Sequence, residues 1–419
     1  MNRRKFIENS ALAGSAVALL GSSACTQKQA SEPSPIGLSP LTDGIEFIDT
    51  EDRKQRMEKA VLLMQNHEID AVFIEAGTSL EYFAGIKWWP SERLTGLLLF
   101  SDGTLNYICP AFEQERLNEL ITIDGDLAIW QEHESPFALV AQIFKSQASS
   151  SGVLGIEENV RFFQADGIAS HLPKATLTNA KVITAGCRAI KSSKELALMK
   201  KANEITLEAY KYGFSKLKEG MSQYELGALV AEASTALGAS ESGWAGAMFG
   251  EYTAYPHGSK TAQQLKEGDL VLIDGGCKLG GYQADITRTT VFGKPSQRQL
   301  DVWNVVKEAQ SAVYEQAKAG VLCEHLDHTA RKVIEKNGFG KGYENFFHRV
   351  GHGIGMDFHE WEYLVKGNAT PMQPGMCFSN EPGIYIYGEL GVRLEDCFYV
   401  TEDGYEAFTP QSPSIDTPI

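Results

Sequence analysis

Apolar and polar positions in the first half of the chain alternate between helical and strand-like periods. Residues 53–67 are amphipathic at helical spacing, and an apolar, strand-like run follows at 71–74. Further along, apolar runs flank the turn sequence Ser101-Asp102-Gly103, which predicts a β-hairpin over 96–109. Helical and strand patterns are therefore mixed across 43–188, which predicts a small α/β domain.

In the second half, serine and glutamate three positions apart mark the starts of two helices. Both Ser192–Glu195 and Ser222–Glu225 have the spacing of a capping box. Two longer helices are expected at 297–319 and 324–337. Helices followed by strand hairpins predict an α+β domain over 189–419, with helices covering one face of a curved antiparallel sheet.

A first hairpin is expected around a glycine-rich turn. The apolar run 270–273 ends at Asp274, and a Thr- and Tyr-rich run, 282–291, contains Asp285. If the hairpin is symmetric about Leu279-Gly280, Asp274 and Asp285 face each other. Directly opposed residues have Cβ atoms about 4.5–5.5 Å apart, so both carboxylates could hold metal ions.

A second hairpin is expected further on. Glu381 precedes a Pro-Gly pair, and a hairpin turning at Gly388 opposes Glu381 to Glu395. Arg393 lies two positions before Glu395. It should point to the same face, because side chains alternate along a strand.

With His352, which lies between glycines, these carboxylates make a set of five donors: Asp274, Asp285, His352, Glu381 and Glu395. A closed zinc site takes about four ligands, so the set is too large for one such site. Four carboxylates balance two divalent cations, and a hydroxide bridging the pair is a nucleophile at neutral pH. The chain holds 54 acidic residues, so any single spacing could arise by chance, and only the combined pattern is specific.

Net charge and the distribution of basic residues limit the classes of partner that are expected. The net charge is −16 at pH 7, and no basic cluster lies outside the first residues, which disfavours nucleic acid as a partner. Seven cysteines are present. Buried thiols are the default reading, and a disulfide stays open as the alternative.

A resemblance to the pita-bread metallopeptidases lies in four segments: IDGGCKLGGYQADITRT, HRVGHGIGMDFHE, SNEPGIY and VRLED. This family includes Xaa-Pro aminopeptidases, prolidases, methionine aminopeptidases and the metal-free relative creatinase. All five family ligand positions are occupied, which argues against the creatinase branch and against relatives that have lost the metal ligands. The segment 43–188, with YFAGIKWW, resembles the creatinase-type N-terminal domain, which simple methionine aminopeptidases lack.

The resemblance also implies roles for further residues. His257 and His359 match histidines that hydrogen-bond the substrate or its tetrahedral intermediate. His348 matches a histidine near the substrate, although a structural role is almost as well supported. Arg393 matches an arginine beside the last ligand, which contacts either that ligand or a substrate carboxylate. Glu381, itself a ligand, is the best candidate to accept the water proton and pass it to the leaving amine.

The function expected is therefore a dinuclear exopeptidase that hydrolyses Xaa-Pro bonds of small peptides. Manganese is the leading metal, and cobalt, iron or zinc are possible. Two alternatives stay open: a related amidohydrolase with a non-proline substrate, and a pita-bread binding protein without catalysis. Relatives with this N-terminal domain are often oligomers, so a homo-oligomer is expected, with Trp88 or Trp89 at the interface.

Residues 1–25 are arranged like an export signal. A basic start with Arg3-Arg4 precedes an apolar stretch, which predicts a twin-arginine signal over 1–25. Small residues before Cys25 are typical of a lipoprotein cleavage site, and ordinary cleavage nearby is the open alternative. Residues 26–42 are expected to form a flexible tether. The protein is thus expected to be exported, either periplasmic or anchored to the membrane through Cys25 and facing the periplasm.

Overall fold

The fold was analysed in a computed structural model, which describes residue 34 and residues 36–419. The predicted export signal at 1–25 and most of the predicted tether at 26–42 lie outside this part of the chain. Within the described residues, no helix is both long enough and apolar enough to cross a membrane.

The described end of the predicted tether lies against the C-terminal half of the molecule. The amide of Leu41 donates a hydrogen bond to the carbonyl of Leu237 at 2.9 Å. Ile36, Leu38 and Leu41 are partly buried against the large hydrophobic core. This end of the segment is therefore attached to the fold.

The N-terminal domain is built on a six-stranded mixed sheet in the order β4-β3-β2-β1-β5-β6. The predicted hairpin over 96–109 is confirmed, since β2 and β3 pair antiparallel. The predicted helix at 53–67 begins earlier, at Thr50, because Asp49 and Asp52 form a capping box. The elements are α1 (Thr50–Asn66), β1 (Ala71–Glu75), α2 (Thr78–Ala84), β2 (Gly96–Phe100), β3 (Leu105–Pro110), α3 (Gln114–Leu120), β4 (Asp126–Trp130), α4 (Pro136–Gln147), β5 (Val153–Ile156), α5 (Phe162–His171), β6 (Thr176–Asn179) and α6 (Lys181–Ala189).

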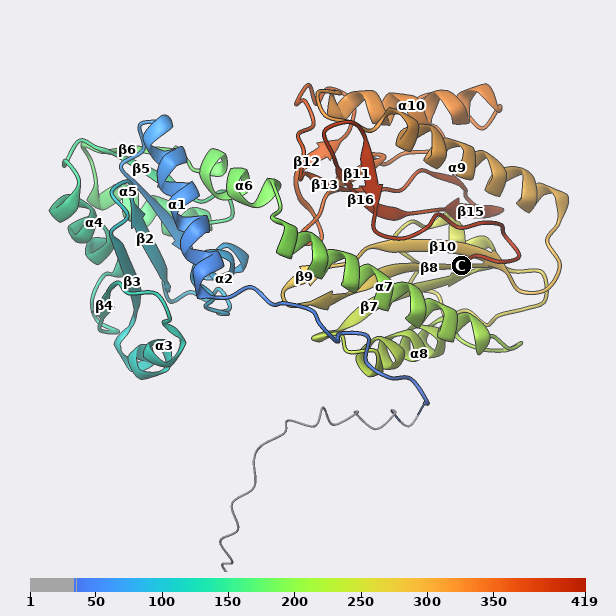
Figure 1. Ribbon diagram of the computed structural model, residues 1–419, viewed down its shortest axis with the longest axis horizontal. Helices are drawn as coiled ribbons and strands as arrows, with labels where there is room; N and C mark the ends of the chain where they lie inside the picture. The colour runs from blue at the N-terminus through green and yellow to red at the C-terminus, as the bar shows by residue number, and fades with distance from the viewer. Residues whose placement is uncertain (1–33, 35) are drawn as a thin grey trace, which may run out of the picture.

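The C-terminal domain consists of antiparallel sheets lined on the outside by helices (Figure 1). Helices α7 and α8 pack on β8 and β7, whereas α9 and α10 pack against β15 and β12. The elements are α7 (Ser193–Ser215), α8 (Gln223–Ala236), β7 (Glu241–Phe249), β8 (Leu270–Leu279), β9 (Tyr282–Gln283), β10 (Ile286–Val291), α9 (Gln297–Gln316), α10 (Cys323–Lys336), β11 (Gly351–Gly353), β12 (Glu360–Leu364), β13 (Cys377–Asn380), β14 (Gly383–Ile386), β15 (Leu390–Arg393), β16 (Asp396–Val400) and β17 (Tyr405–Ala407).

The helix starts predicted from sequence are confirmed. Ser192 and Ser222 each cap a helix, and the glutamate three positions later bonds back in both cases. The helix expected at 297–319 ends earlier, at Gln316, because Ala317 has extended backbone. The six cysteines in the described part of the chain are buried and unpaired, as the default reading predicted.

In the C-terminal domain, β10 is joined to the segment that contains β15 and β16 by an isolated bridge and a buried ion pair. The amide of Glu395 donates to the carbonyl of Thr287 at 3.1 Å. Next to it, Arg288 Nη2 lies 2.5 Å from Asp396 Oδ1, and both side chains are fully buried. The same guanidinium donates to the carbonyls of Glu395 and Pro410. These contacts connect β10, which follows Asp285, to the strands on either side of Glu395.

This arrangement predicts a strong dependence of stability on Arg288. Arg288→Met should lower the free energy of unfolding by about 3–5 kcal/mol, because it leaves the Asp396 carboxylate buried and uncompensated. Denaturant unfolding followed by circular dichroism measures the loss. The matched control is Arg298→Met, whose pair with Glu389 is solvent-exposed and should contribute at most about 1 kcal/mol. Equal losses of unfolding free energy in the two variants would show that the buried Arg288–Asp396 pair contributes no more than an exposed one.

Candidate metal centre

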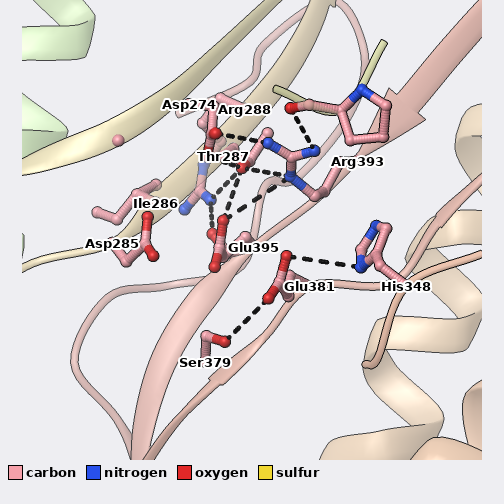
Figure 2. A network of polar contacts seen from close by, with 12 residues as sticks. Asp274, Asp285, Ile286, Thr287, Arg288, His348, Ser379, Glu381, Arg393 and Glu395 are labelled. Atoms are coloured by element: carbon pink, nitrogen blue, oxygen red, sulfur yellow. Dashed lines mark hydrogen bonds and ion pairs between the residues drawn. The ribbon is translucent and has the colours of Figure 1, made fainter. Parts of the chain in front are cut away.

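The five predicted ligands come together in one cavity of about 780 Å³. Four of them are buried and Glu381 is partly buried. Figure 2 shows the four carboxylates gathered in one region. They lie within strands or at strand ends: Asp274 in β8, Asp285 between β9 and β10, His352 in β11, Glu381 between β13 and β14, and Glu395 between β15 and β16.

The first hairpin has a different register from the one expected. Asp274 pairs with Thr287, so the direct opposition of Asp274 to Asp285 is wrong. The turn is centred on Gly280-Gly281, where φ is +56° and +91°. A two-residue hairpin with φ > 0 at both central positions favours glycine at each, whereas the expected centre would place Leu279 there. Asp285 therefore lies diagonally from Asp274, on the same face of the sheet.

The second hairpin is confirmed. Gly383 pairs with Arg393 in one ladder and Asn380 pairs with Asp396 in the next, which places Glu381 opposite Glu395 between them. Gly388 has φ of +77° at the turn. Because Arg393 points to the same face, its guanidinium reaches the ligands.

Behind the ligands lies a network that connects Arg393 to two of the carboxylates (Figure 2). Arg393 Nη2 lies 2.6 Å from Asp274 Oδ2, and Arg393 Nε donates to Thr287 Oγ1 at 2.9 Å. Thr287 Oγ1 lies 2.7 Å from Asp274 Oδ1 and 2.6 Å from Glu395 Oε2. A hydroxyl has one proton to donate, so it bonds one of the two carboxylates at a time and keeps both oriented. Thr287 was not predicted as a site residue, because the incorrect register hid its position opposite Asp274.

His352 is oriented as a ligand. Its Nδ1 lies 3.0 Å from the carbonyl of Gly353 and donates to it. The Nε2 lone pair then faces Asp285 Oδ2 at 3.6 Å and Glu381 Oε1 at 3.4 Å. These separations are those of donors arranged around an ion with ligand distances of about 2.0–2.2 Å. A backbone partner on the other ring nitrogen is the usual way to fix a metal-binding histidine.

The chemistry of the donor set fits divalent metal. One oxygen of Glu395, Oε1, is buried and has no hydrogen-bond partner. It belongs to a carboxylate that can place a ligand atom within 4.8 Å of those of Asp285 and His352. Burial, followed by repulsion between the carboxylates, raises the pKa of Asp285, raises that of Glu381 to about 7, and raises that of Glu395 well above its usual value. Bound cations would remove both penalties.

The remaining predicted residues line the same cavity. The ring of His359 lies 4.1 Å from that of His352, between centroids. Burial, with charge from His352 and Arg349 next, lowers the pKa of His359, so its imidazole is neutral at pH 7. His257 also lines this cavity, next to Pro256.

His348 has both ring nitrogens engaged by the protein. Nδ1 donates to the carbonyl of Arg349 at 2.8 Å, and Nε2 accepts from the Tyr385 hydroxyl at 2.7 Å. Burial lowers the pKa of His348 to about 3, so it stays neutral. Tyr385 in turn accepts from Arg393 Nη1 at 3.1 Å. His348 therefore supports Tyr385 and, through it, Arg393.

Comparison with known proteins agrees with this geometry. The profile of "Metallopeptidase family M24" matches residues 197–402, and that of "Creatinase/Prolidase N-terminal domain" matches 56–190. An Xaa-Pro dipeptidase of Lactobacillus helveticus is 34% identical over 359 residues, which cover 84% of this chain and 96% of that protein. The chain belongs to metallopeptidase family M24. The family and the fold expected from the sequence are thus confirmed.

Two solved structures resemble most of the chain. The dipeptidase PepE of Mycobacterium ulcerans has a TM-score of 0.83 at 28% identity and covers 89% of this chain and 100% of its own. An X-Pro aminopeptidase of Thermotoga maritima has a TM-score of 0.75 at 27% identity, with coverage of 86% and 99%. The present M24 chain is accordingly a hydrolase with the pita-bread fold.

The raised pKa values predict how metal stabilises this M24 protein. Without metal, folding holds a proton on Glu381 up to a pKa of about 7 instead of 4.5. The stability contributed by this proton is present below pH 4.5 and is lost as the pH rises through 7. Metal takes the place of the proton, so the increase in melting temperature on adding Mn²⁺ should be small at pH 5.5 and large at pH 8. Calorimetry with manganese or with EDTA measures it, and an increment independent of pH would contradict the assignment.

Proposed function

We propose that this M24 chain is a dinuclear metal-dependent exopeptidase that hydrolyses Xaa-Pro bonds. The observation that carries the proposal is the cavity in which four carboxylates and one imidazole converge with a buried, unpartnered Glu395 oxygen. The names of the Lactobacillus and Thermotoga relatives support proline specificity. Five donors leave room for two cations, of which manganese is the first choice and cobalt, iron or zinc are alternatives.

Bound divalent ions would supply an activated water and would polarise the scissile carbonyl. Proton transfer is then assigned to side chains of the protein. Glu381 lines the cavity with Oε1 facing His352 Nε2 at 3.4 Å, so it is placed to accept a proton from water and to return it to the leaving amine. Ser379 donates to Glu381 Oε1 at 3.3 Å and keeps this carboxylate turned toward His352.

Two histidines are proposed to stabilise the tetrahedral state. His257 and His359 both line the cavity, and each can donate one hydrogen bond to the developing oxyanion or leaving group. Arg393 is fully engaged by Asp274, Thr287 and Tyr385. We therefore assign it to holding a ligand rather than to binding a substrate carboxylate.

The function is tested by metal analysis together with peptide cleavage. The wild type should bind two ions per chain and cleave an Xaa-Pro peptide but not the matched Xaa-Ala peptide, as followed by mass spectrometry. Asp285→Asn should lose metal and most turnover, whereas Glu389→Gln, which changes an exposed carboxylate, should lose neither. Full activity in a metal-free Asp285→Asn protein would rule out the mechanism. Metal without Xaa-Pro cleavage would favour the non-proline amidohydrolase, and neither property would favour a binding protein.

The histidine roles give a separate test. His257→Ala and His359→Ala should keep fold and metal but lower kcat about 10²–10³-fold, the loss typical of an oxyanion donor. Steady-state kinetics on the Xaa-Pro peptide measures this. The exposed His67 provides the control, since His67→Ala should leave kcat unchanged. Loss of metal with normal activity after reloading would show that the histidines have another role.

Assembly and location complete the proposal. Trp89 is 80% exposed, whereas Trp88 is partly buried under the guanidinium of Arg116. Of the two, Trp89 is the one proposed to lie in a homo-oligomer interface, and Trp89→Ala should then weaken association in analytical ultracentrifugation. Export through Arg3-Arg4 is proposed from the sequence of residues 1–25, with lipidation at Cys25 and ordinary cleavage nearby as the two alternatives. Cell fractionation of a protein with both arginines changed to lysine tests it, and continued export would oppose it.

A further inference from the structure

The loop that carries His359 is closed by a buried carboxylate. Residues 354–359 connect β11 to β12, and Oε1 of Glu360, the first residue of β12, accepts hydrogen bonds from the amides of Met356 at 2.9 Å and Asp357 at 3.2 Å. Glu360 is 6% exposed. A Cβ added to Gly355 would lie 2.6 Å from Glu360 Oε2, so the carboxylate fills the inside of the loop. The conformation of the loop thus depends on where Glu360 is held.

Glu360 is held from outside the catalytic sheets. Arg188, at the end of α6 in the N-terminal domain, donates to Glu360 and, through Nη2, to Asp357 Oδ2 at 2.6 Å. Lys191 Nζ, in the connection to α7, donates to Glu360 Oε2 at 2.9 Å. Thr78, at the start of α2, donates to Asp357 Oδ1 at 2.6 Å. Figure 1 shows α6 leading from the N-terminal domain into α7.

These contacts are strong in electrostatic terms. Burial opposes ionisation of Glu360, but the positive charges of Arg188 and Lys191 outweigh it and lower its pKa to about 2. The side chains of Arg188, Lys191 and Glu360 are each at most 5% exposed. Water screens such a buried pair little, so the cluster stays ionised and intact across the physiological pH range.

His359 directly precedes Glu360 and connects two cavities. One is the metal cavity, and the other is a space of about 630 Å³ between the domains, which Arg188, Asp357 and Glu360 also line. His359 itself is exposed to these spaces, and its ring has its close aromatic contact with His352. The position of His359 is therefore set mainly by the backbone of its loop.

We propose that Arg188 is a positioning residue for His359: by holding Asp357 and Glu360 it fixes the loop, so the N-terminal domain controls the geometry of the active site. This inference rests on the proposed function, in which His359 donates a hydrogen bond to the reacting group. A displacement of about 1 Å in such a group can reduce turnover about a hundredfold. Arg188 and Thr78 do not line the metal cavity.

A double-mutant cycle tests the proposal. In the wild-type background, Arg188→Met should lower kcat on an Xaa-Pro peptide about tenfold to a hundredfold, with metal content unchanged and KM little affected. In a His359→Ala background, the same change should have almost no further effect on kcat, because residues acting through one another are not additive. Arg188→Lys should restore part of the activity. Equal losses in both backgrounds, or no loss in the first, would overturn the proposal.

Two further variants separate positioning from general destabilisation. Thr78→Val removes only the hydrogen bond to Asp357, so it should fold even if Arg188→Met does not, and it should show the same non-additivity with His359→Ala on a smaller scale. Arg56→Met is the matched control: Arg56 is buried and pairs across the domain boundary with Glu195 at 3.1 Å. Its loss should reduce stability without lowering kcat of the folded enzyme.

Hydrogen exchange gives a readout that does not need activity. The amides of Met356 and Asp357, which donate to Glu360, should exchange faster in Arg188→Met and Thr78→Val but not in Arg56→Met. Unchanged exchange would overturn the anchoring itself. If the wild type cleaved no Xaa-Pro peptide, the proposed function would fail, while the exchange experiment would still decide whether Arg188 holds the loop.

Discussion

The structure depends on one unfavourable arrangement, in which four carboxylates are gathered in a single buried cavity. Desolvation and mutual repulsion oppose their ionisation, as the raised pKa values of Glu381 and Glu395 show. Arg393 provides a buried positive charge close to them, and it is fixed against Asp274. A site of this kind is unfavourable without cations and becomes favourable with them, so folding of this region and metal binding are thermodynamically linked.

Because the carboxylates repel one another, the strands that carry them must be held together by contacts outside the cavity. The buried pair of Arg288 and Asp396 connects the strands next to two of the ligands. Thr287 does the same on the cavity side, where its hydroxyl lies between Asp274 and Glu395. These contacts hold the ligand-bearing strands together from outside the ligand set, which favours a pre-organised reaction centre.

The sequence predicts much of this site, and its failures have physical causes. The hairpin that turns at Gly388 was predicted correctly, because only one glycine marks that turn. The turn of the first hairpin was predicted one position too early, which shifts the strand pairing by two residues. The run of glycines allows several turn centres, and only the positive φ at both Gly280 and Gly281 decides between them. Thr287 was missed as a consequence. The helix starts were predicted well because a capping box is local, within three residues.

Contacts between domains could not be predicted in the same way. Arg188 and Glu360 are 172 positions apart, and no local pattern distinguishes them from other charged residues of the chain. Their pairing becomes visible only when α6 and the β11–β12 loop are placed side by side. Yet this contact gives the N-terminal domain a physical role beyond covering the site. An ion pair in a low-dielectric environment is directional when it is also hydrogen-bonded. The Arg188–Glu360 pair can therefore fix the β11–β12 loop relative to the N-terminal domain.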